Sequence, residues 1–269
     1  MSELENLFVV FGHQILLFVF FGSVAIILVI EGLAPFRKQE GGSLTRWFNN
    51  VFLSIINQWA QLYLSPLLVM YLGGLSLSSG SLLSLFHANF VEEFLITLVG
   101  LEFVGYWWHR LSHKNALLWR LHAVHHSDVD VDATTALRHH PAEIIMGNLI
   151  NVFVIMAIGA QPMVVLACSL TSVAIDAFTH GNISLGKVER WIGLFIVTPG
   201  FHRVHHCADK EFTDSNFSNN FPWFDYLFGT ARYRSSEEQA LMPLGLEYFR
   251  GYRNSWIDRL LLQPLMSRS

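Results

Sequence analysis

The sequence predicts an all-α integral membrane protein, in which a transmembrane helical bundle carries a helical headpiece on its cytoplasmic side. Three observations lead to this prediction. The chain of 269 residues is 52% hydrophobic and only 14% charged, which is unusual for a soluble protein. Several long stretches contain almost no charged residue. Most of the histidines fall in short clusters at the edges of those stretches, and the headpiece is expected to carry them.

Charge-free stretches locate the membrane spans. No charged residue occurs in residues 7–30 or 47–91, and the stretches 94–108 and 144–186 contain one acidic residue each. A helix needs about 20 apolar residues to cross about 30 Å of hydrocarbon, so the long stretches hold more than one crossing. Residues 159–162 (Gly-Ala-Gln-Pro) are expected to form the turn inside the last stretch. The expected spans are residues 7–30, 51–72, 91–108, 144–159 and 162–179.

Positive charges indicate which ends of the spans face the cytoplasm. Starting outside, five crossings place residues 31–50, 109–143 and 180–269 on one side. All 17 Lys and Arg lie in those segments, and such asymmetry marks the cytoplasmic face. The same topology, chosen without reference to histidine, puts every histidine cluster on that face. We therefore expect a multi-pass protein with cytoplasmic histidine clusters. An even number of crossings between residues 51 and 90 would break this agreement.

The histidine clusters have the spacing of metal ligands. Residues three and four apart lie on one face of an α-helix, so each cluster presents its rings in one direction. Neutral imidazole binds zinc, iron, copper and nickel, and eight rings exceed the four positions of one tetrahedral metal. Without a metal, so many buried imidazoles would leave donors or acceptors unsatisfied. Two metal ions are therefore predicted, with His109, His113, His122, His125, His126, His202, His205 and His206 as ligands.

Other polar residues of the same region are expected to assist these ligands. His140 and His180 are counted as further metal ligands, and a place beside the ligands is the open alternative for both. His139 is interpreted as a surface or capping group. Asp176 lies one helical turn before His180 and is expected to accept the ring N–H of that histidine. Glu102 lies too far along its helix for a direct bond to the first cluster, which favours a structural role.

The three clusters resemble the histidine boxes of the fatty acid hydroxylase/sterol desaturase superfamily, a group of membrane di-iron oxygenases. The superfamily signature is HX3H, HX2HH and HX2HH, with membrane spans between the second and third boxes. In this chain the boxes read HRLSH at 109–113, HAVHH at 122–126 and HRVHH at 202–206. The order, the spacing and the intervening apolar stretch all match. This combination is far more specific than one histidine pair.

Flanking residues extend the resemblance beyond the boxes. The segment 138–143 is similar to the HP-hydrophobic-E element of the superfamily, 178–182 to its FxHxN element, and 225–230 to its WDxLFGT ending. Three positions depart from the pattern. Phe217 and Ser218 stand where the DxNYG element has Tyr and Gly, and Phe224 stands where the ending has Trp. These departures leave the predicted ligands intact, but they put in doubt any transfer of a substrate from one subgroup.

The resemblance also divides the chain into three parts. Residues 1–90 are expected to form N-terminal transmembrane helices, residues 91–230 a catalytic domain like that of the superfamily, and residues 231–269 a C-terminal interfacial tail.

The resemblance implies O2-dependent hydroxylation or desaturation of a C–H bond in a lipid of the sterol or fatty-acyl type. Two iron ions are the implied cofactors, and zinc can substitute for them in purified protein. The chain has no GxGxxG fingerprint and no cysteine set for an iron–sulfur cluster. Electrons are therefore expected from a ferredoxin or small cytochrome with its reductase. The expected partners are the lipid, this donor and the membrane, with no nucleic acid.

Two other functions would use the same ligands. A zinc-dependent membrane hydrolase usually needs a carboxylate base such as the Glu of HExxH, and that motif does not occur here. A metal transporter should place its ligands near the middle of the bilayer, whereas these histidines are expected at one surface. The residues alone leave both alternatives open.

Overall fold

The computed structural model describes residues 3–39, 43–73, 82–85 and 87–266. These residues form helices and loops without a strand, and a single isolated β-bridge joins Cys207 to Leu244. The predicted all-α class is therefore confirmed.

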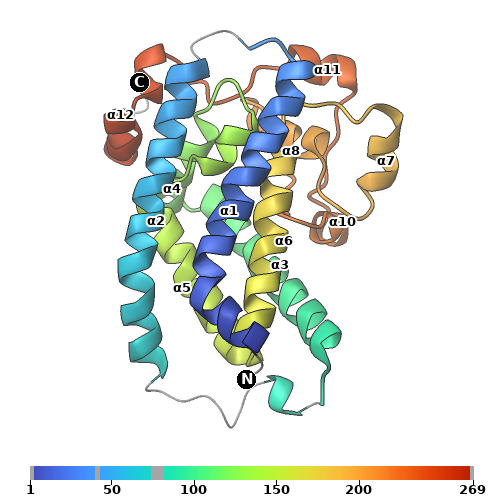
Figure 1. Cartoon of the computed structure of the whole chain (residues 1–269). Coiled ribbons are helices and arrows are strands. Elements are labelled where there is room, and N and C mark those ends of the chain that lie inside the picture. The colour runs from blue at the N-terminus through green and yellow to red at the C-terminus, as the bar shows by residue number, and fades with distance from the viewer. Residues whose placement is uncertain (1–2, 40–42, 74–81, 86, 267–269) are drawn as a thin grey trace.

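In the described part of the chain, five long helices form an elongated bundle (Figure 1). They are α1 (Glu3–Leu33), α2 (Ser43–Gly73), α3 (Phe90–Lys114), α5 (Pro141–Ile158) and α6 (Pro162–Thr179). Helix α1 packs along α6, α2 packs against α5, and α3 packs against both α5 and α6. Successive helices of the bundle run in opposite directions, so the segments that follow α1, α3 and α6 all emerge at the end opposite the amino terminus.

Local sequence signals explain where these helices begin and end. Helix α3 starts with a capping box between Asn89 and Glu92. Asn115 both ends α3 and caps the next helix, because its side chain accepts two of that helix's first N–H groups. Gly159 ends α5 in the left-handed region at φ 81°, and Pro162 starts α6. The turn expected at residues 159–162 is therefore confirmed.

Three of the described helical segments are long and apolar enough to cross a membrane. They are residues 11–33, 141–158 and 162–179, which match three of the five expected spans. Many of their apolar side chains point outward, as in Phe18 and Val29 of α1 and Phe153 of α5. Such surfaces are stable against lipid rather than water, so the protein is a membrane protein. The other two expected spans correspond to α2 and α3, which run beside these three.

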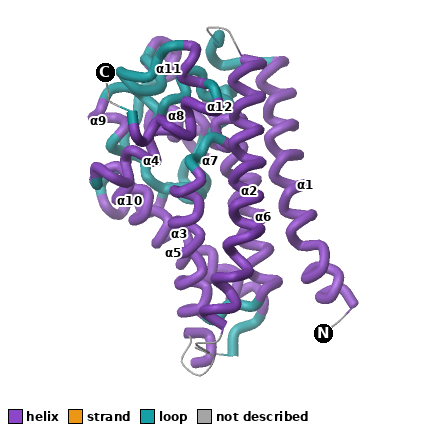
Figure 2. The backbone as a smooth tube through the Cα atoms, turned by 90° about the vertical axis from the view of Figure 1, so that its left-hand side faces the viewer, coloured by secondary structure: helices purple, strands orange, loops and turns teal. Residues whose placement is uncertain are grey.

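Shorter helices build a headpiece at one end of the bundle (Figure 2). The α-helices in it are α4 (Ala116–His126), α7 (Glu189–Ile192), α8 (Pro199–His205), α9 (Lys210–Thr213), α10 (Trp223–Phe228), α11 (Ser236–Leu241) and α12 (Ile257–Leu262). Among the 3-10 turns, η2 (Ala133–Leu137), η3 (Gly186–Val188), η4 (Tyr252–Ser255) and η5 (Gln263–Leu265) lie in these segments, while η1 (Leu82–Leu85) precedes α3.

A buried polar network fixes the headpiece to the bundle. Arg46 of α2 forms ion pairs with Asp128, at 3.0 Å, and with Asp132. Arg138 donates to the carbonyl of Val124 at 2.9 Å and to Ser127 Oγ at 2.8 Å. Removing one partner of a buried ion pair typically costs about 3–5 kcal/mol, because the other charge stays buried without compensation. This network therefore holds the segment after α4, and the second histidine box with it, in a fixed position.

The C-terminal tail packs against the rest of the protein. Leu260 of α12 is fully buried and contacts Leu53 of α2 and Val124 of α4. Helix α12 therefore covers the outer side of the second histidine box.

Candidate metal centre

The three histidine boxes meet inside the headpiece. The first box occupies the last two turns of α3, the second the end of α4, and the third α8 with the residue that follows it. His180, at the C-terminus of α6, points into the same region. All nine of these histidines are less than a tenth exposed. Segments up to about a hundred residues apart therefore bring their rings to one buried place.

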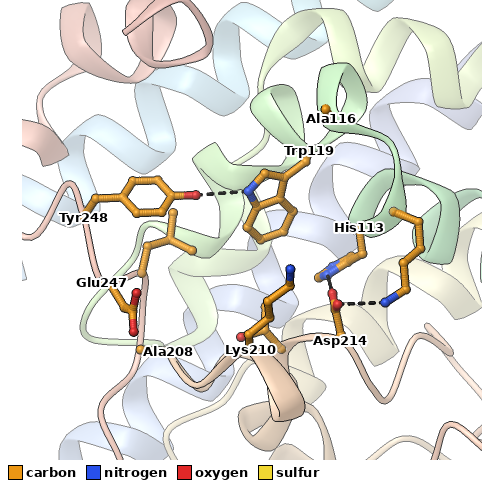
Figure 3. Close-up of a pocket in the computed structure, with 11 residues that line it drawn as sticks. His113, Ala116, Trp119, Ala208, Lys210, Asp214, Glu247 and Tyr248 are labelled. Atoms are coloured by element: carbon orange, nitrogen blue, oxygen red, sulfur yellow. Dashed lines mark hydrogen bonds and ion pairs between the residues drawn. The ribbon is translucent and has the colours of Figure 1, made fainter. Parts of the chain in front are cut away.

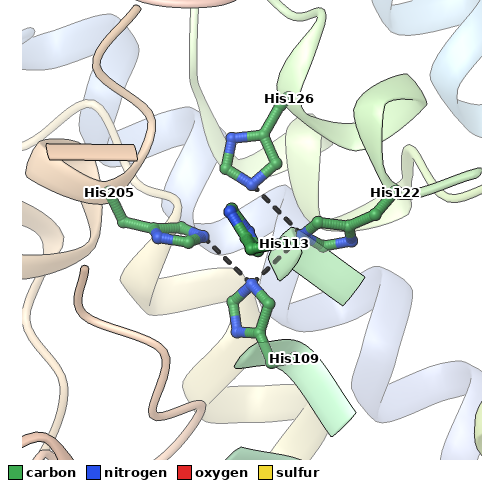
Figure 4. Close-up of side chains that lie close together, drawn as sticks. All are labelled: His109, His113, His122, His126 and His205. Carbon is green, nitrogen blue, oxygen red and sulfur yellow. Dashed lines mark hydrogen bonds between the residues drawn. The ribbon is translucent and has the colours of Figure 1, made fainter. Parts of the chain in front are cut away.

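Five of the rings form one group (Figure 4), which we call the five-histidine group. One ring nitrogen from each residue lies within 4.8 Å of those of the others. All three boxes contribute, and the group consists of His109, His113, His122, His126 and His205.

The remaining four rings form a second group, the four-histidine group, by the same criterion. It consists of His125, His180, His202 and His206. The two groups are neighbours, because the rings of His126 and His206 stack at 4.6 Å between centroids. The structure thus brings together nine of the ten histidines predicted as ligands, in two sets that each suffice for one metal ion.

Hydrogen bonds at Nδ1 set the direction of several rings. Oxygen acceptors of the chain lie close to the Nδ1 atoms of three rings in the five-histidine group: Phe217 O is 2.8 Å from His109, Glu143 Oε1 is 2.6 Å from His122, and Ser215 O is 2.6 Å from His205. A carbonyl or carboxylate oxygen only accepts, so each Nδ1 carries the hydrogen. The Nε2 lone pair of each ring then faces into the group.

The resulting arrangement fits a bound cation. The Nε2 atom of His109 lies 3.1 Å from that of His122 and 3.0 Å from that of His205, with no hydrogen between them. Burial lowers the pKa of His205 well below its usual value, so protonation does not relieve the repulsion between these lone pairs. Two nitrogens bound cis to one metal at about 2.1 Å lie about 3 Å apart, which matches the observed separations.

Asp176 lies beside His180 as the sequence predicts. Its carboxylate oxygen is 3.2 Å from Nδ1 of His180, and its backbone carbonyl is 2.8 Å from the same atom. Both oxygens therefore favour the tautomer that leaves Nε2 of His180 free. That Nε2 atom lies 2.9 Å from Nε2 of His202 and 3.2 Å from Nε2 of His125, inside the four-histidine group.

The structure places His139 beside the four-histidine group and His140 outside both groups. His140 caps α5, with Nδ1 accepting from the N–H of Ala142 and Nε2–H donating to the carbonyl of Leu261. Both nitrogens of His140 are occupied, and the ring lies outside both groups. His139, interpreted from the sequence as a surface or capping group, instead stacks on His125 at 4.3 Å between centroids and 10° between planes.

Glu143 connects the two groups, a role that the sequence reasoning did not assign. Its carboxylate binds His122 of the five-histidine group and lies 3.4 Å from Nδ1 of His139, which stacks on His125 of the four-histidine group. The available signal was the acidic residue that ends the 138–143 element, four residues after His139.

Glu102 has a structural role. It is 2% exposed and accepts the backbone N–H groups of Asn219 and Asn220, each at 2.9 Å, and the side-chain amide of Asn220 at 2.7 Å. The carboxylate thereby attaches the segment after the third box to α3. The preference for a structural role agrees with these contacts.

A cavity of about 280 Å³ reaches the five-histidine group (Figure 3). His113 and Trp119 line its inner end, and the ring centroids of these two residues are 4.9 Å apart. Asp214 lies 3.4 Å from Nδ1 of His113 and 2.7 Å from Nζ of Lys114. Phe217, which is 1% exposed, contacts the rings of three histidines of the same group.

Comparisons with known proteins agree with this geometry. Alkylglycerol monooxygenase from Xenopus tropicalis is 31% identical over 137 residues, which cover 50% of this chain and 29% of that protein. An ornithine lipid hydroxylase from Rhizobium tropici is 25% identical over 219 residues, covering 79% of this chain and 65% of that protein. A very-long-chain aldehyde decarbonylase from Oryza sativa subsp. indica is 27% identical over 180 residues, covering 63% of this chain and 28% of that protein.

The match to each of these relatives spans less than two thirds of the relative's own length. No solved structure gives a significant match to the chain. The model of the fatty acid hydroxylase family matches residues 94–230, which is just over half of the chain and contains all three boxes. The same residues contain His180, which joins the boxes in the two histidine groups, and the chain belongs to the fatty acid hydroxylase family.

Proposed function

We propose that this protein is a membrane-bound di-iron oxygenase that hydroxylates or desaturates a C–H bond of a lipid substrate. The observation that carries the proposal is the convergence of nine buried histidines into two adjacent groups, each with its ring nitrogens within 4.8 Å of one another. One iron ion would be held by the five-histidine group and the other by the four-histidine group. Relatives named as a monooxygenase and a hydroxylase of lipids support O2 chemistry of this kind.

Two bound irons would supply the oxidising power that an unactivated C–H bond requires. The residues of the chain would hold this centre in place and keep bulk water from it. Carbonyls of Ser215 and Phe217, and the carboxylate of Glu143, fix the rings that face the first metal position. The ring of Phe217 packs against that position, and Tyr106, which is fully buried, packs behind Phe217 at 6.1 Å between centroids.

The membrane topology and the electron supply belong to the same proposal. Five crossings would place the headpiece on the cytoplasmic face, because all 17 Lys and Arg lie in the segments at that end. A ferredoxin or small cytochrome would then deliver electrons there, since the sequence carries no motif for a redox carrier of its own. The lipid substrate would enter from the membrane, and sterol and fatty-acyl chains are the classes proposed.

The decisive experiment measures metal content and oxygen consumption of protein purified under mild conditions. We expect about two irons per chain, as two ligand groups require, and O2 uptake that depends on lipid and on an added carrier system. The His125→Ala variant, which lacks one proposed ligand of the four-histidine group, serves as the control. Stoichiometric zinc together with O2-independent turnover would support the hydrolase alternative instead. Metal flux in vesicles would support the transporter alternative.

Two further measurements address the partner and the substrate. Turnover with NAD(P)H and no added carrier would contradict the proposed external donor. Lipid profiles of cells with and without the protein are expected to differ in one hydroxylated or unsaturated lipid class, which would identify the substrate.

A further inference from the structure

Two short segments of the headpiece hold large apolar side chains outward. Residues 186–195 include η3 and α7, and residues 223–228 form α10; together we call them the α7–α10 platform. No residue of η3 or α7 is buried. Trp191 is 63% exposed, Phe195 64% and Leu227 70%. Contiguous exposed apolar side chains of this size mark an interaction surface, since water is an unfavourable neighbour for them.

Specific bonds hold this platform rigid. The indole N–H of Trp223 donates to the carbonyl of Leu194 at 3.0 Å, and the hydroxyl of Tyr226 donates to the carbonyl of Gly193 at 2.6 Å. Asp225, on the inner side of α10, accepts two backbone N–H groups, each at 2.8 Å. Hydrogen bonds therefore fix the backbone that carries the exposed apolar side chains. Their exposure does not result from a loosely packed loop.

The basic side chains of the platform face outward, and its acidic side chains face inward. Lys187 and Arg190 are exposed, and the guanidinium of Arg190 lies over the ring of Trp191, 5.4 Å from the ring centroid. Glu189 turns inward, where its carboxylate accepts the N–H of Gly200 at 2.8 Å. The outer surface thus combines aromatic and aliphatic groups with positive charge, a combination suited to the boundary between anionic headgroups and acyl chains.

The platform is continuous with the apolar surface of the bundle. Leu95, Val99, Phe103 and Trp107 form an exposed stripe along α3, because they are spaced by four residues. Phe103 contacts Phe224 of α10 at 5.4 Å between centroids, and Trp107 contacts Phe228 at 5.0 Å. Figure 1 shows α7 and α10 on the outside of the five-helix bundle. A bilayer around the bundle therefore also meets the platform.

We propose that the α7–α10 platform lies in the interfacial layer of the bilayer and binds anionic lipid. Trp191, Phe195 and Leu227 enter the boundary between headgroups and acyl chains, and Lys187 and Arg190 pair with anionic headgroups. This contact fixes the depth and tilt of the headpiece relative to the membrane. The proposal concerns a surface outside the histidine groups, so it stands or falls independently of the catalytic activity.

Site-specific fluorescence quenching tests this proposal on the full-length protein in nanodiscs that contain phosphatidylglycerol. Phe195→Cys and Leu227→Cys carry the label, and Leu241→Cys is the matched control, because Leu241 on α11 is also apolar and is 86% exposed. The two native cysteines are buried, which directs the label to the new position. Quenchers are lipids with a doxyl group high on the acyl chain, and iodide in the water.

We expect a severalfold loss of fluorescence with doxyl lipid at positions 195 and 227, and little quenching there by iodide. Position 241 should show the opposite pattern. Quenching by iodide at all three positions would overturn the proposal. Protection from both quenchers, with a short label-to-label distance in dipolar spectroscopy, would indicate a second copy of the chain on this surface and would also overturn it.

The charged residues allow a second test of the lipid class. Replacing phosphatidylglycerol by phosphatidylcholine, or combining Lys187→Gln with Arg190→Gln, should reduce quenching by doxyl lipid at position 195. Equal quenching in all of these conditions would overturn the assignment of anionic lipid. Retained iron content in each variant would show that the centre is intact.

Discussion

The two histidine groups differ in how their rings are held. In the five-histidine group, three rings donate Nδ1–H to a carbonyl or carboxylate: His109, His122 and His205. In the four-histidine group only His180 has such a partner, while the Nδ1 atoms of the other three are buried without a hydrogen-bond partner. The protein therefore preorganises the first metal position more firmly than the second. In the four-histidine group, the bound metal must therefore fix the orientation of more of the rings.

The stronger support of the five-histidine group comes from the loop after α9. Asn216 adopts the left-handed region at φ 54°, which Asn tolerates better than most residues, and its side-chain amide donates to the carbonyls of Phe201 and Arg232. Asp225 accepts the N–H groups of the two residues that follow Asn216. The loop is fixed from both sides, and so are the carbonyls that orient two ligand histidines.

Loss of one central ligand from either group should have the largest effect. We expect His205→Ala and His125→Ala each to abolish turnover, because one comes from each group and the proposed reaction needs both metals. Both variants should still insert in the membrane, since neither residue contacts lipid. Activity and membrane fractionation check this prediction. Wild-type activity in either variant would show that the ligand assignment is wrong.

Because one group has five histidines and the other has four, we expect them to respond differently when one histidine is removed. His113→Ala leaves four histidines in its group and should retain metal, whereas His202→Ala leaves three and should lose about one ion per chain after dialysis. Metal analysis and iron spectroscopy distinguish the two outcomes. Equal metal loss in both variants would mean that the larger group has no spare ligand.

Glu143→Gln tests the connection between the groups. The substitution keeps the size of the side chain but removes the charge that holds His122 and His139, so we expect metal affinity or activity to fall about 10–100-fold. Glu102→Gln is a matched control, because Glu102 is an equally buried carboxylate bonded to backbone N–H groups rather than to histidine. It should lower thermal stability while metal affinity stays close to that of the wild type.

Asp176→Asn should have a smaller effect than Glu143→Gln. The carboxylate of Asp176 is 41% exposed, and the backbone carbonyl of the same residue already accepts Nδ1–H of His180. We expect a loss of metal affinity in the four-histidine group below about 10-fold. A competition assay with a chelator measures it. A loss as large as that of Glu143→Gln would show that the carbonyl alone does not orient His180.

The eight box histidines could be predicted to share a site because helical geometry decides their direction. Spacings of three and four residues place the rings of each box on one face, and the antiparallel helices α5 and α6, which lie between the second and third boxes, return the chain to the same end of the bundle. The fold class could likewise be read from long apolar stretches. The first inference depends on the spacing of residues and the second on apolar stretches, and both are local patterns that the sequence contains in full.

The roles of His139, His140 and Glu143 could not be predicted in the same way. The two histidines precede Pro141 in a segment without helical periodicity, so tertiary packing alone decides which ring faces the centre. The backbone at His140 is extended, with φ −70° and ψ 137°, as the residue before a proline prefers, and consecutive side chains of extended backbone point to opposite sides. One histidine had to face inward, and only the packing of α5 shows that it is His139.

His140→Ala should therefore have the smallest effect of the series. His140 lies outside both groups, and its two ring nitrogens bond to the backbone at Ala142 and Leu261. Losing this cap should cost about 1 kcal/mol of stability and leave metal content unchanged. His139→Ala is the neighbouring comparison, and it should weaken metal binding, since His139 stacks on His125. If the His140→Ala variant instead lost an iron ion, the ring of His140 would have to reach the metal centre in the metal-bound protein. The roles that this geometry assigns to His139 and His140 would then be exchanged.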